Sequence, residues 1–190
     1  MAVPLTHEEV NFETPGAAIA RGRIPGDDSL RSGPRLTSEQ VWRALARASF
    51  GVLGYVTPTG EPRSSGVVYK IVRRRLYVAV APDSWKAKHI AASGRVAVTV
   101  PVRRGGIASL VFPIPPATIS FHGAAIVRQA GSTEVSSVVR ELAPLLPAER
   151  RASSLLIEIL PEGDFLSYGL GVSLTKMRTP AAARGRVPVS

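Results

Sequence analysis

The sequence contains no cysteine, and its 190 residues include only three histidines. The absence of cysteine excludes disulfides, thiolate metal sites and cysteine nucleophiles. The histidines show no H-x-x-x-H spacing, so we expect no metal site. No apolar run approaches the roughly eighteen residues of a membrane span, and no basic segment followed by an apolar one opens the chain. We therefore expect no membrane span, no secretory signal and a cytoplasmic protein.

Aromatic residues make up only 6% of the chain, whereas the net charge is +10. Residues 1–36 carry four basic and five acidic side chains, residues 37–175 carry sixteen and nine, and residues 176–190 carry four and none. The positive charge is spread over the chain, and the aromatic rings are too few for a base-stacking platform. Both facts argue against nucleic-acid binding, which would predict steeply salt-dependent retention of DNA or RNA. A basic domain also attracts phosphorylated small molecules.

Three segments differ in composition. Residues 1–36 are rich in proline and glycine and lack apolar periodicity, so we expect a flexible arm that is either disordered or wrapped around a partner subunit. Residues 37–175 form the expected domain. Residues 176–190 form a basic tail, which from Thr179 onward has no pattern and is expected to be mobile or laid on the surface.

The middle segment is rich in short strands. A capping box at Thr37–Gln40 predicts a helix over 38–48, and further helices are expected over 83–92 and 133–146. Residues 103–116 predict a long loop with an apolar tip, which either covers a substrate pocket or forms dimer contacts. Strands are expected over 50–56, 63–72, 76–81, 95–102, 117–128 and 154–160, with another starting at 165. Six or more mostly antiparallel strands with peripheral helices predict a mainly β fold, a small barrel.

The start of the helix over 83–92 carries the most informative chemistry. Asp83 suits the positive end of a helix as a cap, whereas Lys86 and Lys88 do not. The hydroxyl of Ser84, free backbone amides and lysines at one helix start can bind a phosphate group. Arg63, at the start of a strand, is a candidate partner that binds phosphate oxygens with its guanidinium fork. The alternative is that these cations lie in solvent.

Several stretches together resemble the pyridoxamine 5′-phosphate oxidase-like, FMN-binding split-barrel superfamily. They are SFGVLGYV at 49–56, TGEPRSS at 59–65, LYV at 76–78, SWKAKHI at 84–90 and RVAV at 95–98. The resemblance is strongest over residues 45–100 and continues more weakly through 119–128 and 155–171. It implies a split β-barrel and a homodimer with a flavin at each of two sites between the subunits.

The resemblance also implies roles for particular residues. Arg63, Ser84 and Lys86 match phosphate ligands, and Thr118 falls where the partner subunit offers a polar side chain. Tyr168 falls where an aromatic ring lies near the flavin. The remaining cofactor-binding positions are Ser64 on the same strand as Arg63, and Val67, Val68, Val80 and Ala81, which would line the ring and ribityl chain.

Three departures from the family pattern limit the function. Trp85 stands where an arginine often joins the phosphate cluster, and Val68 stands where the true oxidases have a lysine. No arginine–histidine pair follows Tyr168, which argues against pyridoxamine phosphate oxidase activity. We therefore expect a flavin-dependent oxidoreductase that transfers hydride between FMN and a small organic substrate, with no catalytic side chain singled out. The alternatives are a reductase that uses the deazaflavin coenzyme, and a non-catalytic flavin- or heme-binding module.

Overall fold

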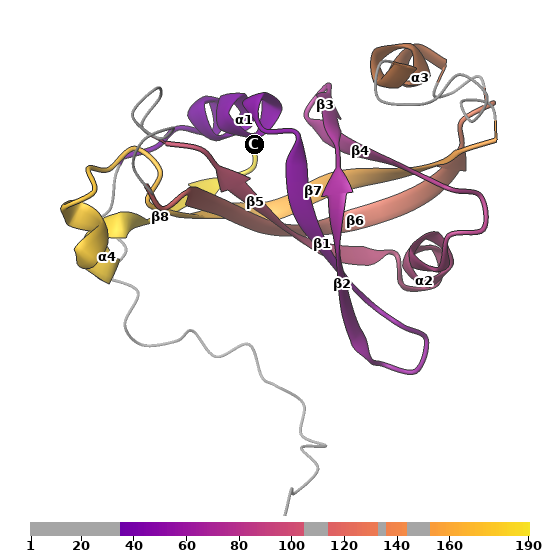
Figure 1. Cartoon of the computed structure of the whole chain (residues 1–190), viewed down its shortest axis with the longest axis horizontal. Coiled ribbons are helices and arrows are strands. Elements are labelled where there is room, and N and C mark those ends of the chain that lie inside the picture. Colours follow the sequence, from indigo (N-terminus) through magenta and orange to yellow (C-terminus); the bar gives the residue numbers. More distant parts are fainter. Residues whose placement is uncertain (1–34, 105–113, 133–135, 144–152) are drawn as a thin grey trace, which may run out of the picture.

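The protein is described here by a computed structural model, which covers residues 35–104, 114–132, 136–143 and 153–190 (Figure 1). The strands of this part of the chain are β1 (Phe50–Val56), β2 (Pro62–Val68), β3 (Lys70–Val72), β4 (Arg75–Val80), β5 (Arg95–Val102), β6 (Ala117–Gln129), β7 (Leu155–Tyr168) and β8 (Arg184–Pro188). The helices are α1 (Ser38–Arg47), α2 (Trp85–Ser93), α3 (Ser136–Leu142) and α4 (Pro180–Ala183), with a short 3₁₀ turn, η6, at Lys176–Arg178.

The strands form one curled antiparallel sheet. Its order is β2-β1-β5-β6-β7-β4-β3, and β8 pairs with β7 beside this path. Figure 1 shows the long β6 and β7 running through the middle, with α1 and α2 towards opposite ends of the molecule. The expected mainly β, mostly antiparallel split barrel with peripheral helices is therefore confirmed.

The concave side of the sheet holds the main core. Val41, Trp42 and Leu45 of α1 are buried there, because they lie on one face of a helix whose capping box at Thr37 and Gln40 is present as expected. The Trp42 ring meets Phe165 of β7 edge-on, with 5.2 Å between ring centroids. The remaining buried residues of this cluster come from all the long strands, among them Leu53, Val78, Val98, Ile119, Phe121, Ile157 and Ile159.

The two boundaries that differ most from expectation are set by tertiary contacts. The strand expected over 63–72 is two strands, because β2 pairs with β1 whereas β3 pairs with β4. Tyr69 lies between them, and its hydroxyl donates to the Leu45 carbonyl oxygen at 2.8 Å. The strands expected over 154–160 and from 165 are one continuous β7, in which Gly163 adopts a φ of +69°. The pairing of β7 with β6 shifts register between Ser120 and His122 of β6.

The expectation that residues from Thr179 onward are mobile or laid on the surface is wrong. They form α4 and β8, and Val187 is buried in the main core because β8 continues the sheet from β7. The Val189 carbonyl oxygen accepts hydrogen bonds from Trp42 Nε1 at 3.1 Å and from Ser38 Oγ at 3.0 Å. The arm, except for residues 35–36, most of the loop over 103–116 and parts of the helix over 133–146 lie outside the described residues.

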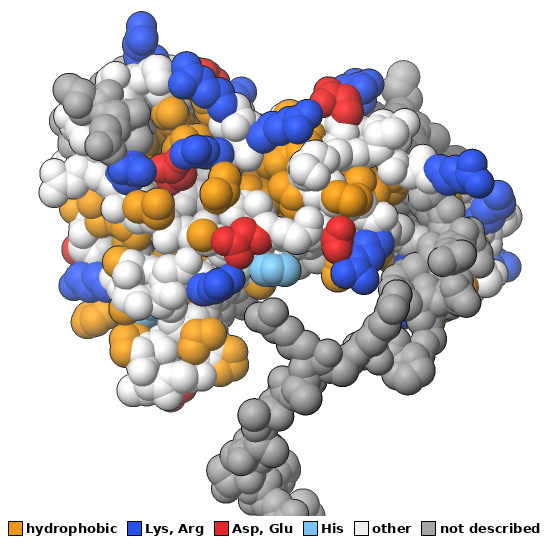
Figure 2. All heavy atoms as spheres, turned by 180° about the vertical axis from the view of Figure 1, so that it is seen from behind, with side chains coloured by type: hydrophobic (Ala, Val, Ile, Leu, Met, Phe, Trp, Pro, Cys, Tyr) orange, Lys and Arg blue, Asp and Glu red, His pale blue; other side chains and the backbone are white. Residues whose placement is uncertain are grey.

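The other side of the sheet exposes several large apolar side chains. Phe50 and Val68 lie opposite each other on β1 and β2, and they are 48% and 51% exposed. Val52 of β1 is in register with Leu166 of β7 through the intervening strands β5 and β6, and Leu166 is 52% exposed. Figure 2 shows one face of the molecule on which hydrophobic side chains lie among lysines and arginines. We call the side of the sheet that carries Phe50, Val52, Val68 and Leu166 the outer face.

Candidate functional site

The start of α2 carries the polar groups of a phosphate site, and no side chain caps the helix there. Ser84 occupies the N-cap position, but its side chain makes no capping hydrogen bond, and no acidic residue lies in the first turn. The expectation that Asp83 caps this helix is therefore wrong, and its side chain is exposed one position earlier. The first N–H groups of the helix and the Ser84 hydroxyl are thus available to an anion.

The two lysines of α2 have different surroundings. The Lys88 amine lies 4.5 Å from the centre of the Trp85 ring, and this ring is 71% exposed. Lys86 is half-buried, lies towards another flank of the helix and forms no ion pair with any described residue. Lys86 is therefore the lysine whose charge can bind an anion at the start of α2. Lys88 has the same charge on the same helix, but its amine lies over the Trp85 ring, so it serves as a control position.

Arg63 lies on the strand next to the one that approaches α2. It pairs with Tyr55 of β1, and the Tyr55 ring lies 6.0 Å from that of His89 in α2. Its guanidinium is 2.8 Å from the Glu61 carboxylate, and both side chains are mostly exposed. An exposed ion pair of this kind contributes about 0–1 kcal/mol, so a phosphate group can compete with Glu61.

Two buried polar atoms in this region have no hydrogen-bond partner. They are Oγ of Ser65, which lies on the same side of β2 as Arg63, and Nδ1 of His89. A buried polar atom without a partner costs about 1–3 kcal/mol, and a bound polar ligand can remove that cost. Together with the uncapped helix start, these atoms fit a site for the phosphate end of a cofactor. We call the group Arg63, Ser65, Ser84, Lys86 and His89 the phosphate corner.

The other cofactor-binding positions expected on β2 and β4 divide between the two sides of the sheet. Val67 is buried in the core, whereas its neighbour Val68 is on the outer face. Ser64 is also exposed and lies opposite Gly54. Val80 is half-buried at the end of β4, and Ala81 is exposed directly after it. Because successive strand residues point to opposite sides, Val67 and Val68 do not line one side of the sheet together.

Thr118 and Tyr168 lie together, but far from the phosphate corner. They are direct partners across β6 and β7, and the Tyr168 hydroxyl donates to the Met177 carbonyl oxygen at 2.9 Å. The end of α2 meets β6 at Ala125, whose N–H donates to the Gly94 carbonyl oxygen. Seven residues along β6 separate Thr118 from Ala125, or about 23 Å at 3.3 Å per residue. Within one chain, Thr118 and Tyr168 are therefore well separated from the point where α2 meets β6.

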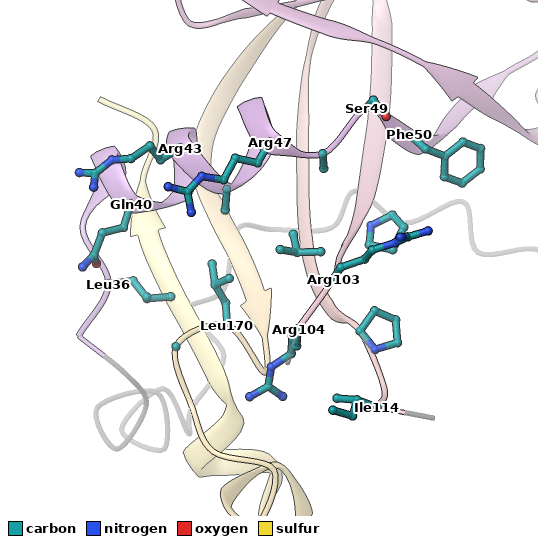
Figure 3. A pocket seen from close by; sticks show the side chains of 16 residues that line it. Leu36, Gln40, Arg43, Arg47, Ser49, Phe50, Arg103, Arg104, Ile114 and Leu170 are labelled. Atoms are coloured by element: carbon teal, nitrogen blue, oxygen red, sulfur yellow. The ribbon is translucent and has the colours of Figure 1, made fainter. Parts of the chain in front are cut away.

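A large cavity lies near the Thr118 end of the sheet. Its volume is about 1340 Å³, and it is lined by α1, the end of β5 and the turn after β7 (Figure 3). Four arginines line it: Arg43, Arg47, Arg103 and Arg104. These four arginines were not among the expected site residues, although the i, i+4 spacing of Arg43 and Arg47 and the adjacent pair Arg103–Arg104 are visible in the sequence.

A second cavity, of about 270 Å³, surrounds a buried carboxylate. Glu158 of β7 is 5% exposed and is bonded by Arg75, by Arg128 Nε at 2.6 Å and by the Tyr77 hydroxyl at 3.2 Å. Burial raises the pKa of the Glu158 carboxyl, but the hydrogen bonds from Arg128 and Arg75 outweigh it, so that the pKa lies below its ordinary value of 4.5. The carboxylate therefore stays ionised and ties β4, β6 and β7 together.

Two features are absent from the described residues. No three or more His, Cys, Asp or Glu side chains gather there in a way that could hold a metal ion. No helix in the same ranges is both long and apolar enough to cross a membrane.

Solved structures with a similar fold include three whose chains overlap most of the described domain. A heme-binding protein from Mycobacterium smegmatis matches with a TM-score of 0.58 and 16% identity, over 73% of this chain and 57% of that one. General stress protein 26 from Bacillus anthracis matches with a TM-score of 0.53 and 20% identity, over 68% and 92%. A proposed pyridoxamine 5′-phosphate oxidase from Listeria innocua matches with a TM-score of 0.50 and 18% identity, over 66% and 93%. No family model and no curated protein sequence matches the chain.

Proposed function

We propose that this protein is a flavin-dependent oxidoreductase with the split-barrel fold, and that it binds the phosphate end of FMN at the phosphate corner. The observation that carries the proposal is the start of α2. There the N-cap serine makes no capping bond, the first turn has no acidic residue, and a half-buried lysine has no ion-pair partner among the described residues.

Each group of the phosphate corner has a distinct task in this proposal. Lys86 supplies a point charge, and the Ser84 hydroxyl and the first N–H groups of α2 donate hydrogen bonds to phosphate oxygens. Arg63 exchanges its exposed contact with Glu61 for a phosphate oxygen. Bound FMN would supply the hydride-transfer chemistry, and the chain supplies binding, orientation and exclusion of water.

We propose further that two copies of the chain form the complete site. The outer face exposes Phe50, Val52, Val68 and Leu166, and large apolar side chains exposed on one face of a sheet favour an interaction surface. A second copy that covers this face would also bring its own Thr118 and Tyr168 towards the phosphate corner of the first. Sedimentation velocity should therefore give a dimer.

The experiment that tests the function is a titration of the full chain with FMN, followed by quenching of flavin fluorescence. Lys86→Ala and Arg63→Ala should each weaken FMN binding about tenfold or more, because each removes a charge-assisted hydrogen bond of about 1.5–3 kcal/mol. Lys88→Ala removes an equal charge from the same helix and should leave the affinity within about twofold. Equal FMN affinity in Lys86→Ala and the wild type would contradict the proposed corner.

A second candidate cofactor is the deazaflavin coenzyme, which also has a phosphate group. It is favoured by Trp85, which is 71% exposed at a position where the FMN-binding family often has an arginine. Parallel titrations with FMN, the deazaflavin coenzyme and hemin should rank the three. Turnover distinguishes an enzyme from a storage or sensing module: a bound flavin that neither NAD(P)H nor a reduced deazaflavin reduces would contradict the oxidoreductase.

A further inference from the structure

The large cavity has apolar walls between two pairs of arginines. Figure 3 shows Arg43 and Arg47 extending from α1 on one side, while Arg103 and Arg104 come from the end of β5 on the other. Leu170 lies between the two sides, and the apolar lining also includes Leu36, Ala44, Val102, Ile114 and Pro116. At about 1340 Å³ the cavity exceeds the roughly 300–1,000 Å³ of ordinary small-molecule pockets.

The positive charge of this cavity is not balanced by its lining. None of the described lining residues is acidic. Arg43 contacts Glu39 at 3.8 Å on the exposed side of α1, and Arg104 donates to the Val172 carbonyl oxygen and lies against the Met177 sulfur. Within the described part of the chain, Arg47 and Arg103 have neither an ion pair nor a hydrogen bond.

Two arginines on opposite walls, with apolar surface between them, favour a particular kind of ligand. A guanidinium pairs best with a carboxylate or phosphate group, often through two parallel hydrogen bonds. Arg47 and Arg103 come from different sides of the cavity, so each of them can hold its own anionic group. An extended molecule with an anionic group at each end and an apolar middle matches both the charges and the walls.

We propose that this cavity binds an organic dianion, with one carboxylate or phosphate group at Arg47, the other at Arg103 and an apolar body against Leu170. Its place in the fold links it to the function proposed above. Pro101 in its lining is the direct partner of Thr118, and Val102 is the partner of Ala117. If the flavin and the dimer form as proposed, on which this step rests, the dianion is the substrate class, because the proposed dimer places Thr118, and with it this cavity, beside the partner's flavin.

The test is isothermal titration calorimetry of the full chain with three molecules of equal length. They are decanedioate, decanoate and 1,10-decanediol, which carry two, one and no anionic groups; decane-1,10-diyl bisphosphate separates phosphate from carboxylate ligands. Decanedioate or the bisphosphate should bind at least about tenfold tighter than decanoate, and the diol should bind more weakly still. A diol that binds as tightly as the dianions would overturn the proposal.

Substitutions of the two arginines test where the dianion binds. Arg47→Gln and Arg103→Gln should each weaken dianion binding about tenfold, and the double variant about a hundredfold, whereas decanoate should lose affinity in one single variant at most. Arg140→Gln, on the exposed side of α3, removes an equal charge elsewhere and should change nothing. Unchanged dianion affinity in the double variant, with its circular dichroism spectrum intact, would refute the site.

The same samples separate this proposal from the function proposed above. Neither Arg47 nor Arg103 belongs to the phosphate corner, so both variants should bind FMN like the wild type. Dianion binding without FMN binding would refute the flavin proposal and leave the cavity proposal standing. With FMN bound, the dianion should shift the flavin absorbance spectrum; a dianion that binds without any shift would overturn its role as substrate.

Discussion

Replacing Glu158 with glutamine should destabilise the fold in a way that depends on pH. The carboxylate is 5% exposed, and it accepts hydrogen bonds from Arg75, Arg128 and Tyr77. Glutamine keeps the size of the side chain but removes its charge, so the two guanidinium groups lose their carboxylate partner. The substitution therefore isolates the electrostatic contribution of this cluster.

The expected loss can be estimated from burial. Removing one partner of a fully buried ion pair costs about 3–5 kcal/mol. Here the side chains of Arg75 and Arg128 are 47% and 30% exposed, so water partly replaces the lost carboxylate. We expect Glu158→Gln to lower the free energy of unfolding by about 2 kcal/mol, which for a chain of this size lowers the Tm by about 4–8 °C.

The assay is urea unfolding followed by circular dichroism, at pH 7 and at several values below 4.5. Because the folded-state pKa of Glu158 lies below its ordinary value, its contribution is fully present above pH 4.5 and is lost as the pH falls through the folded-state pKa. The stability gap between wild type and variant should shrink over that range. Glu162→Gln is the control: Glu162 lies on the same strand as Glu158 and pairs with Arg95 at the surface. Its replacement should lower the free energy of unfolding by less than about 0.5 kcal/mol. A gap below about 0.5 kcal/mol for Glu158→Gln at pH 7, or one that stays constant on acidification, would refute the reasoning.

Two further substitutions test the sheet and the phosphate corner. A Cβ at position 123 would lie 2.2 Å from the Leu160 carbonyl oxygen, so Gly123→Ala should lower the free energy of unfolding in urea by about 2–3 kcal/mol. In Gly54→Ala the new Cβ would meet its nearest atom at 3.6 Å, and the loss should be under about 1 kcal/mol. Similar losses in both variants would contradict this explanation. Ser84→Ala removes no capping bond, so the unfolding free energy should change by under about 0.5 kcal/mol while the FMN dissociation constant rises about tenfold in fluorescence titration. A loss of stability without a loss of FMN affinity would show that Ser84 serves the helix alone.

The elements that could be predicted from sequence are those decided locally. The capping box at Thr37 fixes the start of α1, and the apolar run at Phe50–Val56 gives β1 with the bounds expected. Gly94, with a φ of +64°, ends α2 as a glycine after a helix should. In each case the controlling groups lie within a few residues of one another, so one short stretch of sequence carries the whole signal.

What could not be predicted depends on contacts between distant residues. β8 has no apolar run of its own and forms because β7 offers it an edge, with Val187 reaching the core. The candidate site is divided in the same way. The sequence pattern indicates Lys86 and Thr118 separately, but only the structure shows how far along β6 Thr118 lies from the point where α2, the helix of Lys86, meets that strand. The arginine cavity joins α1 to the end of β5, over fifty residues later, and no local pattern reports that meeting.

The hydrogen bonds from Trp42 and Ser38 to the Val189 carbonyl oxygen span 147 and 151 residues of sequence. As the chain leaves the ribosome, α1 emerges early and cannot make these bonds until residue 189 has been added. Arg43 and Arg47 lie on that helix, so the position of the wall they form depends on a contact made by a residue far along the sequence. A change in β8 or just after it is therefore also a change to the arginine wall, although β8 itself contributes no residue to the described lining of the cavity.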